Sequence, residues 1–142
     1  MSTSADIDDI EDGLKFQPKF DAAGLVTCVA TDVASGEVLM VAHMNEVALR
    51  RTIATGEAWY FSRSRNALWR KGETSGQTQR LVEMRLDCDQ DAVWIRVEQL
   101  GAACHTGRRS CFYRKVEAGE GGARLSFVDA DRLFDPKEVY RK

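Results

Sequence analysis

The chain has 142 residues, 44% of them hydrophobic, and a formal net charge of -2 at pH 7. This length suits one domain with a single core, and the acidic pI of about 5.7 argues against a broad nucleic-acid-binding surface. The longest apolar runs are too short to cross a membrane and the N-terminus lacks the apolar core of a signal peptide, so we expect a cytoplasmic protein without membrane or nucleic-acid partners.

Composition divides the chain into three parts. Residues 1–17 are acidic and lack hydrophobic periodicity, which predicts a flexible arm. Residues 18–134 carry the periodic segments and form the one predicted domain. Residues 135–142 form a polar tail.

The first periodic segments predict a β-hairpin. Residues 24–33 and 37–42 are rich in β-branched side chains and flank a short turn. Cys28 falls on the apolar face of this hairpin, which favours a core position over a metal-ligand role. His43 stands alone after the second strand, so we interpret it as a structural residue.

A helix and a strand are predicted next. Residues 46–55 contain helix formers, Asn45 before them is a good N-cap, and Gly56 after them tolerates the positive φ of a helix end. Residues 58–62 read as a strand.

Residues 62–77 combine hydroxyl groups, cations and two glycines in one predicted loop. These are the groups that hold a phosphate dianion. The spacing does not match a Walker motif, however, and a charged loop is more often simply solvated.

Alternating side chains predict a second hairpin, with strands over residues 80–87 and 92–99 joined by a turn at residues 89–91. The apolar face of its first strand is expected to carry Val82, Met84 and Leu86. Residues 123–128 are a predicted last strand, and residues 129–134 a predicted short helix.

Asp89 and Asp91 lie in the predicted turn and Asp87 ends the strand before it. Their carboxylates suit a hard cation such as magnesium or calcium. The spacing is similar to the opening of an EF-hand loop, but Ala92 replaces the required glycine and the flanks read as strands. The alternative without a metal is an acidic hairpin turn.

Three cysteines, Cys88, Cys104 and Cys111, predict a zinc site of thiolate ligands. They do not form a Cys-x-x-Cys pair, and three ligands leave a fourth position for water or substrate, which indicates catalysis. His105 could move protons at that position or could itself be the fourth ligand.

Four motifs in this order resemble the phosphoribosyl-AMP cyclohydrolase family of histidine biosynthesis. They are Ser62-Arg-Ser-Arg65, Leu68-Trp-Arg-Lys-Gly-Glu-Thr-Ser-Gly76, Asp87-Cys-Asp-Gln-Asp91 and Cys104-His-Thr-Gly-Arg-Arg-Ser-Cys111. The resemblance implies hydrolysis of the N1–C6 bond of the adenine ring in phosphoribosyl-AMP, which gives the phosphoribosyl-formimino carboxamide ribotide. It also implies a mainly β (α+β) fold, a compact pseudobarrel of two sheets with one or two short helices.

The resemblance further implies a homodimer that uses zinc and magnesium. The zinc ligands would be Cys88 of one chain with Cys104 and Cys111 of the other, and His105 would act in proton transfer. The magnesium ligands would be Asp87, Asp89 and Asp91. The phosphorylated nucleotide substrate would be bound by Arg63, Arg65, Lys71, Thr74 and Ser75, and Trp69 could stack on the base or pack in the core.

Two positions depart from the family pattern, in which many members have Trp at His43 and His at Gln77. The second departure places more of the expected proton transfer on His105. The competing interpretation is a zinc-stabilised module whose basic loop binds RNA or a protein, which predicts a fourth zinc ligand and a broad basic surface.

Overall fold

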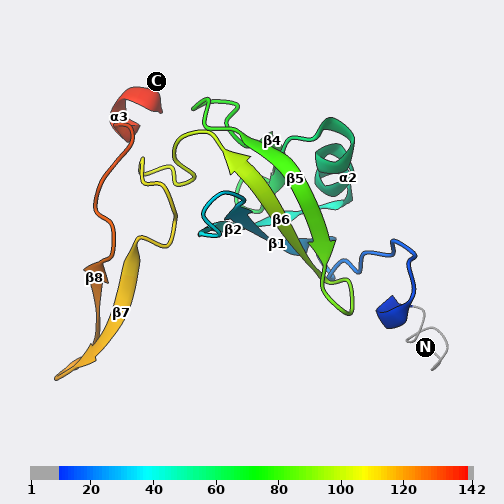
Figure 1. Ribbon diagram of the computed structural model, residues 1–142, viewed down its shortest axis with the longest axis horizontal. Helices are drawn as coiled ribbons and strands as arrows, with labels where there is room; N and C mark the ends of the chain where they lie inside the picture. Colours follow the sequence, from blue (N-terminus) through cyan, green and yellow to red (C-terminus); the bar gives the residue numbers. More distant parts are fainter. Residues whose placement is uncertain (1–9, 141–142) are drawn as a thin grey trace.

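The computed structural model describes residues 10–140, shown in Figure 1. It is built mostly from strands, which confirms the mainly β, α+β class. The elements in chain order are β1 (Val26–Asp32), β2 (Val38–Met44), α2 (Glu46–Thr55), β3 (Trp59–Ser62), β4 (Ala67–Arg70), β5 (Gln79–Leu86), β6 (Ala92–Gln99), β7 (Arg114–Gly119), β8 (Gly122–Phe127) and α3 (Pro136–Val139).

The central element is a four-stranded sheet with the order β2-β1-β6-β5. The two predicted hairpins, β1–β2 and β5–β6, are confirmed and are both antiparallel. They join through the parallel pairing of β1 with β6, in which Cys28 lies opposite Val93. The sheet thus brings the two predicted hairpins into one layer.

The predicted helix is confirmed with its expected ends. The Asn45 side chain accepts a hydrogen bond from the Ala48 backbone N–H at 2.8 Å, and Gly56 has a φ of 75°, the left-handed conformation that glycine adopts without strain. Ala48 and Leu49 turn inward from α2 and are fully buried.

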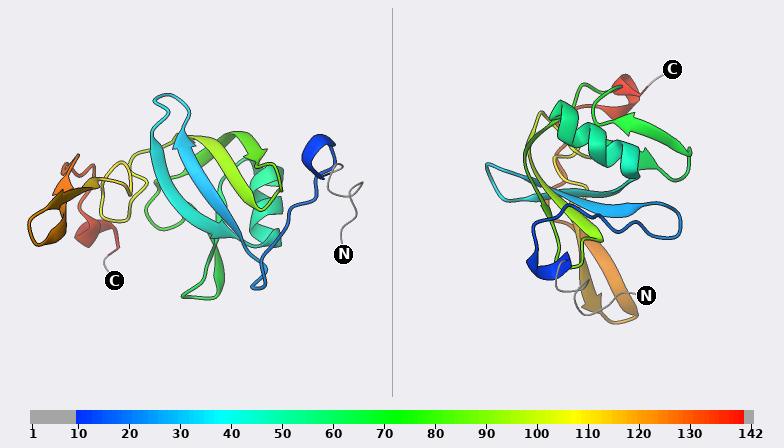
Figure 2. Two further views of the ribbon diagram at one scale, coloured as in Figure 1. Left: turned by 90° about the horizontal axis from the view of Figure 1, so that it is seen from below. Right: turned by 90° about the vertical axis from the view of Figure 1, so that its right-hand side faces the viewer.

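The core lies between the sheet, α2 and the β3–β4 hairpin, as the two views in Figure 2 illustrate. Its largest fully buried side chains include Tyr60, Leu39, Met44, Leu49 and Ile95. Cys28 is also fully buried among them, which confirms its predicted structural role. Burial raises the pKa of its thiol to about 12, so it remains protonated at neutral pH.

Three details of the strand and helix prediction were wrong. The expected loop 62–77 contains β4, which pairs with β3. Val82 is exposed because a bulge between Leu81 and Glu83 shifts the alternation, so that Leu81 packs on the core in its place. Residues 129–134 are not helical, and the last helix is α3, further along the chain.

A third sheet, the two-stranded hairpin β7–β8, adds to the two expected sheets. It projects away from the body of the molecule (Figure 1). Among the described residues, no helix has the length and apolarity needed to cross a membrane. The predicted arm 1–17 and tail 135–142 lie partly outside the described residues.

Candidate metal centre and substrate cavity

The segment between β6 and β7 carries Cys104, His105 and Cys111 without regular secondary structure. Backbone hydrogen bonds fold it back on itself: Ala103 N–H donates to Arg109 O at 2.9 Å, and Cys104 N–H donates to Arg108 O at 3.1 Å. This reversal brings the two cysteines, seven positions apart in sequence, to the same place.

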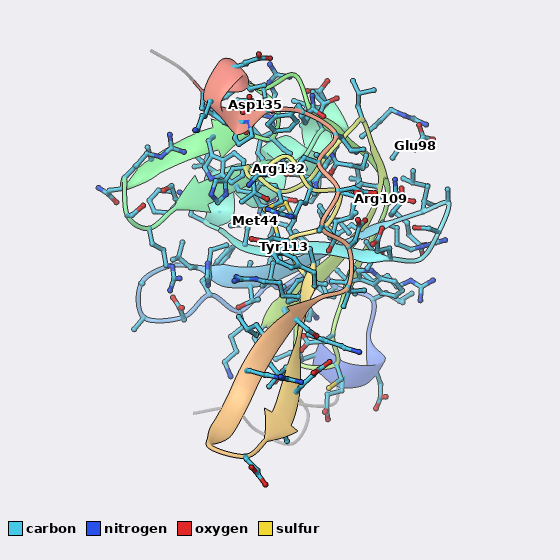
Figure 3. All side chains as sticks on the ribbon, turned by 90° about the vertical axis from the view of Figure 1, so that its left-hand side faces the viewer. Met44, Glu98, Arg109, Tyr113, Arg132 and Asp135 are labelled. Carbon is cyan, nitrogen blue, oxygen red and sulfur yellow. The ribbon has the colours of Figure 1, made fainter. Side chains whose placement is uncertain are left out.

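The folded segment is fixed to the end of the β1–β2 hairpin. Cys111 N–H donates to Leu39 O at 2.7 Å, and the Ser110 hydroxyl donates to Val38 O at 2.7 Å. The Arg109 guanidinium pairs with Asp32 at 2.9 Å and Glu37 at 2.6 Å, and Figure 3 shows it beside that turn. Backbone and side-chain bonds together hold the cysteine pair against the sheet.

The two thiols form one electrostatic unit with Lys71. Desolvation and, after it, the neighbouring Cys104 raise the pKa of Cys111 against the opposing effect of the Lys71 cation, and the resulting pKa is about 12. The Thr106 hydroxyl also contacts Cys104 Sγ at 3.1 Å. Both sulfur atoms can therefore meet one soft metal ion, whose binding to Cys111 would have to displace the proton of that thiol.

Lys71 is buried, with an exposed fraction of 6%, although it was predicted to bind phosphate. Its ammonium donates to Ala103 O at 2.6 Å. Burial lowers the pKa of this ammonium, whereas Cys111 and Cys104 raise it. The lysine side chain is therefore placed beside the cysteine pair.

A cavity of about 520 Å³ opens next to the thiols. It collects seven of the residues predicted from the sequence, namely Arg65, Trp69, Lys71, Thr74, Ser75, His105 and Cys111. His105 is exposed in it, where it can exchange protons with a bound molecule.

A second cavity of about 550 Å³ borders the first, and Ala42, Arg65 and Trp69 line both. Arg63 and His43 lie in this second cavity. Desolvation and the nearby Arg63 lower the pKa of His43, whereas Asp21 opposes them. The lowered pKa favours the neutral imidazole. Together the cavities offer two cationic ends for one elongated anionic ligand.

The acidic turn between β5 and β6 brings oxygen atoms of Asp87, Asp89 and Asp91 within 4.8 Å of one another. Partial burial opposes ionisation of Asp87, but hydrogen bonds, chiefly from Ala92 N–H at 3.1 Å, lower its pKa. Hydrogen bonding to Asp89 and then Asp87 raises the pKa of Asp91. Carboxylate oxygens this close could hold a metal ion.

Cys88 is exposed in this same acidic turn, whereas the segment between β6 and β7, which carries the other two cysteines, begins at the opposite end of β6 (Figure 1). Cys88 is separated from the other two cysteines by three strand spacings across the sheet and about four residues along the strands. The resulting distance is on the order of 20 Å. Among residues 10–140, the acidic turn is the single place where three His, Cys, Asp or Glu side chains bring possible ligand atoms this close together. One chain thus does not gather all three cysteines.

Gln77, where many family members have histidine, lies outside both cavities. Its Oε1 accepts a hydrogen bond from Ala102 N–H at 2.8 Å, and its Nε2 donates to Ser75 O at 3.2 Å. Gln77 therefore connects the loop before β5 to the segment between β6 and β7 that carries Cys104 and Cys111.

Several cavity residues were not predicted individually from the sequence. Arg70, Gly72 and Glu73 belong to the predicted loop 62–77, whereas Met40, Val41, Ala42, Ala103 and Tyr140 lie outside it. Tyr140 follows α3, which brings the C-terminal segment to the cavity. The signal for this helix was available, since Asp135 caps it and Pro136 occupies its first turn.

Comparison with known proteins decides the family. Residues 40–113 match the family model described as Phosphoribosyl-AMP cyclohydrolase. The chain belongs to the phosphoribosyl-AMP cyclohydrolase family. This part of the cyclohydrolase chain includes every site residue predicted from the sequence, from Arg63 to Cys111.

Curated phosphoribosyl-AMP cyclohydrolases are similar over nearly the whole chain. The protein from Bradyrhizobium diazoefficiens is 84% identical over 98% of this chain and 99% of its own length. The protein from Nitrobacter hamburgensis is 76% identical over 99% of this chain and 96% of its own. One from Rhodopseudomonas palustris is 66% identical over 99% and 97%, respectively.

Proposed function

We propose that this protein opens the purine ring of phosphoribosyl-AMP by hydrolysis between N1 and C6, in the cytoplasmic pathway of histidine biosynthesis. The product would be the phosphoribosyl-formimino carboxamide ribotide. The observation that carries this proposal is the cavity that Cys111 and His105 line together with residues of the predicted phosphate-binding loop 62–77. The identity of 84% to a protein named for this activity supports the same reaction.

The zinc would be held by Cys104 and Cys111 of one chain and Cys88 of a second chain in a homodimer. Zinc–sulfur bonds of about 2.3 Å require the three sulfur atoms to lie within roughly 4 Å of one another. Cys88 lies at the far end of its own sheet, and its exposure leaves it available to a partner. When bound, zinc would supply a nucleophile from water at neutral pH.

His105 would move protons during ring opening. Its side chain is exposed in the cavity that Cys111 also lines, so it can face a substrate held there. Hydrolysis adds a hydroxyl group at C6 and needs a proton at N1 when the bond breaks. An imidazole is suited to both transfers near neutral pH.

Arg63 and Arg65 would hold one phosphate, with Thr74 and Ser75 orienting a neighbouring group. The two arginines are exposed at the second cavity, and the hydroxyl residues line the first. Trp69 lines both cavities and lies 5.0 Å from the Tyr60 ring centre, so it could stack on the base from the edge of the core.

Lys71 would serve the metal centre and not a phosphate, since it is buried and bonded to Ala103 O. A complex of zinc with three thiolates carries a net charge of -1, which a buried ammonium offsets. Asp87, Asp89 and Asp91 would hold magnesium, whose charge could neutralise a substrate phosphate.

The test is turnover of phosphoribosyl-AMP, followed by the absorbance change on ring opening, together with zinc content. We expect activity in the zinc-loaded parent, loss of zinc and activity in Cys104→Ala, and loss of rate with zinc retained in His105→Ala. Cys28→Ala is the matched control, because it removes a thiol from the core and should keep zinc. A folded, zinc-loaded parent that does not turn over the substrate with magnesium present would refute the proposal.

A further inference from the structure

Gln90 differs from its neighbours in the acidic turn. It is buried, with an exposed fraction of 6%, whereas the residues on either side of it, Asp89 and Asp91, are exposed. Its side chain contacts the segment before β1.

Four hydrogen bonds join Gln90 to this segment, residues 10–19. The Oε1 atom accepts from Gln17 N–H at 2.7 Å, and Nε2 donates to Lys15 O at 3.2 Å and Ile10 O at 3.3 Å. The backbone oxygen of Gln90 accepts from Lys19 N–H at 2.7 Å. The N-terminal segment runs past the turn in both Figures 1 and 2.

The backbone of Gln90 is in an unfavourable conformation. Its φ is 61°, and the other non-glycine residue with a positive φ among those described is Asn66 at 50°. Asparagine tolerates the left-handed region, whereas a longer side chain adopts it at a cost. A glutamine at this position is explained by its reach, because the same amide contacts two carbonyl groups and an N–H group of the segment.

The same turn fixes the metal ligands. Gln90 N–H donates to Asp87 O at 3.1 Å, while Asp91 N–H and Ala92 N–H donate to Asp87 Oδ1 at 3.0 and 3.1 Å. A change in the backbone at Gln90 therefore moves Asp91 relative to Asp87.

We propose that Gln90 is a positioning residue, which uses residues 10–19 as a support to hold the acidic turn in the conformation that binds a divalent cation. This inference rests on the proposed magnesium role of the three aspartates. It gives the N-terminal segment a function in the metal site, although none of its own side chains is a ligand.

The first test removes one hydrogen bond without changing Gln90. Gln17→Pro lacks the backbone N–H that donates to Oε1, and Gln17→Ala keeps it as the matched control. Both are made in the full chain, and Mn²⁺ binding is measured by electron paramagnetic resonance, with Asp89→Asn defining binding at the turn. Loss of one such bond is expected to weaken Mn²⁺ binding by about three- to tenfold in Gln17→Pro, with little change in Gln17→Ala.

The second test changes Gln90 itself. Gln90→Gly relieves the backbone cost but loses the side-chain bonds, so we expect weaker Mn²⁺ binding and faster hydrogen exchange at Asp91 and Ala92. Adding Gln17→Pro to this variant should cause no further loss, because the same bond is already absent. Asn66→Gly is the control for relief of positive φ elsewhere, and it should leave Mn²⁺ binding unchanged.

The outcomes separate this inference from the proposed function. Mn²⁺ binding that is tight in the parent, abolished in Asp89→Asn and unaffected by Gln17→Pro or Gln90→Gly would overturn the role of Gln90 alone. A parent that binds no Mn²⁺ at the turn would overturn both the magnesium role and this inference. Selective weakening in Gln17→Pro and Gln90→Gly would support it.

Discussion

Gly101, between β6 and the cysteine segment, is expected to tolerate no side chain. Its φ is 70°, and a Cβ atom built on it would overlap Gln77 Oε1. That oxygen is the acceptor for Ala102 N–H, one residue further along the chain. Gly101→Ala therefore strains the backbone and also displaces the Gln77 side chain from its hydrogen bond with Ala102 N–H.

The expected cost is the sum of two effects. An alanine in the left-handed region costs roughly 1–2 kcal/mol. Leaving Ala102 N–H without its acceptor adds about 1–3 kcal/mol. The free energy of unfolding should then fall by about 2–5 kcal/mol, which lowers the Tm of a chain of this size by roughly 5–20 °C.

Thermal and urea unfolding of the parent and Gly101→Ala measure this loss. Gly36→Ala is the matched control, because its φ is 76° but nothing lies within 4 Å of an added Cβ, so only the backbone cost of about 1–2 kcal/mol applies. In a Gln77→Ala background, Gly101→Ala should cost no more than this control. Equal losses in Gly101→Ala and Gly36→Ala, or full additivity with Gln77→Ala, would refute the reasoning.

Three further predictions concern the cysteines and Lys71. Cys88→Ala and Cys104→Ala should each be inactive on their own. An equal mixture after subunit exchange should regain about a quarter of parent turnover, because half the dimers are mixed and each mixed dimer has one complete cysteine set out of two. If native mass spectrometry detects mixed dimers but turnover does not recover, a shared zinc site is contradicted. The Cys28 thiol has its pKa raised from about 9 to about 12 in the folded state, so unfolding releases its proton above pH 9 and stability falls as pH rises. Between pH 8 and 10 the parent should lose about 1.4 kcal/mol more than Cys28→Ala by urea unfolding, and parallel profiles would contradict this. Lys71→Met should weaken Zn²⁺ binding about tenfold in chelator competition and Lys71→Arg much less, whereas equal weakening would argue against a role of its charge.

Local patterns were sufficient for much of the fold. Helix α2 follows from Asn45 and Gly56, which cap it through contacts within a few residues. The two hairpins follow from alternation and turn residues, which also act over short distances. The same is true of the acidic turn, because carboxylates two residues apart in a tight turn must converge.

Only the tertiary structure decided how distant segments meet. The sequence places Lys71 in the predicted phosphate loop, and the fold carries its long side chain to Ala103, across 32 positions of sequence, where its ammonium lies near the thiols. The exposure of Val82 depends on a bulge in the pairing of β5 with β6, which no pattern within β5 reveals. Gln90 likewise contacts residues more than 70 positions away.

The cysteines illustrate both what the sequence predicts and what only the tertiary structure decides. Their number and residue type predicted a zinc site, since thiolate chemistry belongs to the residues themselves. Their positions depend on the sheet, which brings Cys104 and Cys111 together at one end and leaves Cys88 at the other. Sequence alone therefore determined which chemical groups the chain carries and predicted their chemistry, whereas the long-range packing of the sheet decided which of these groups lie together.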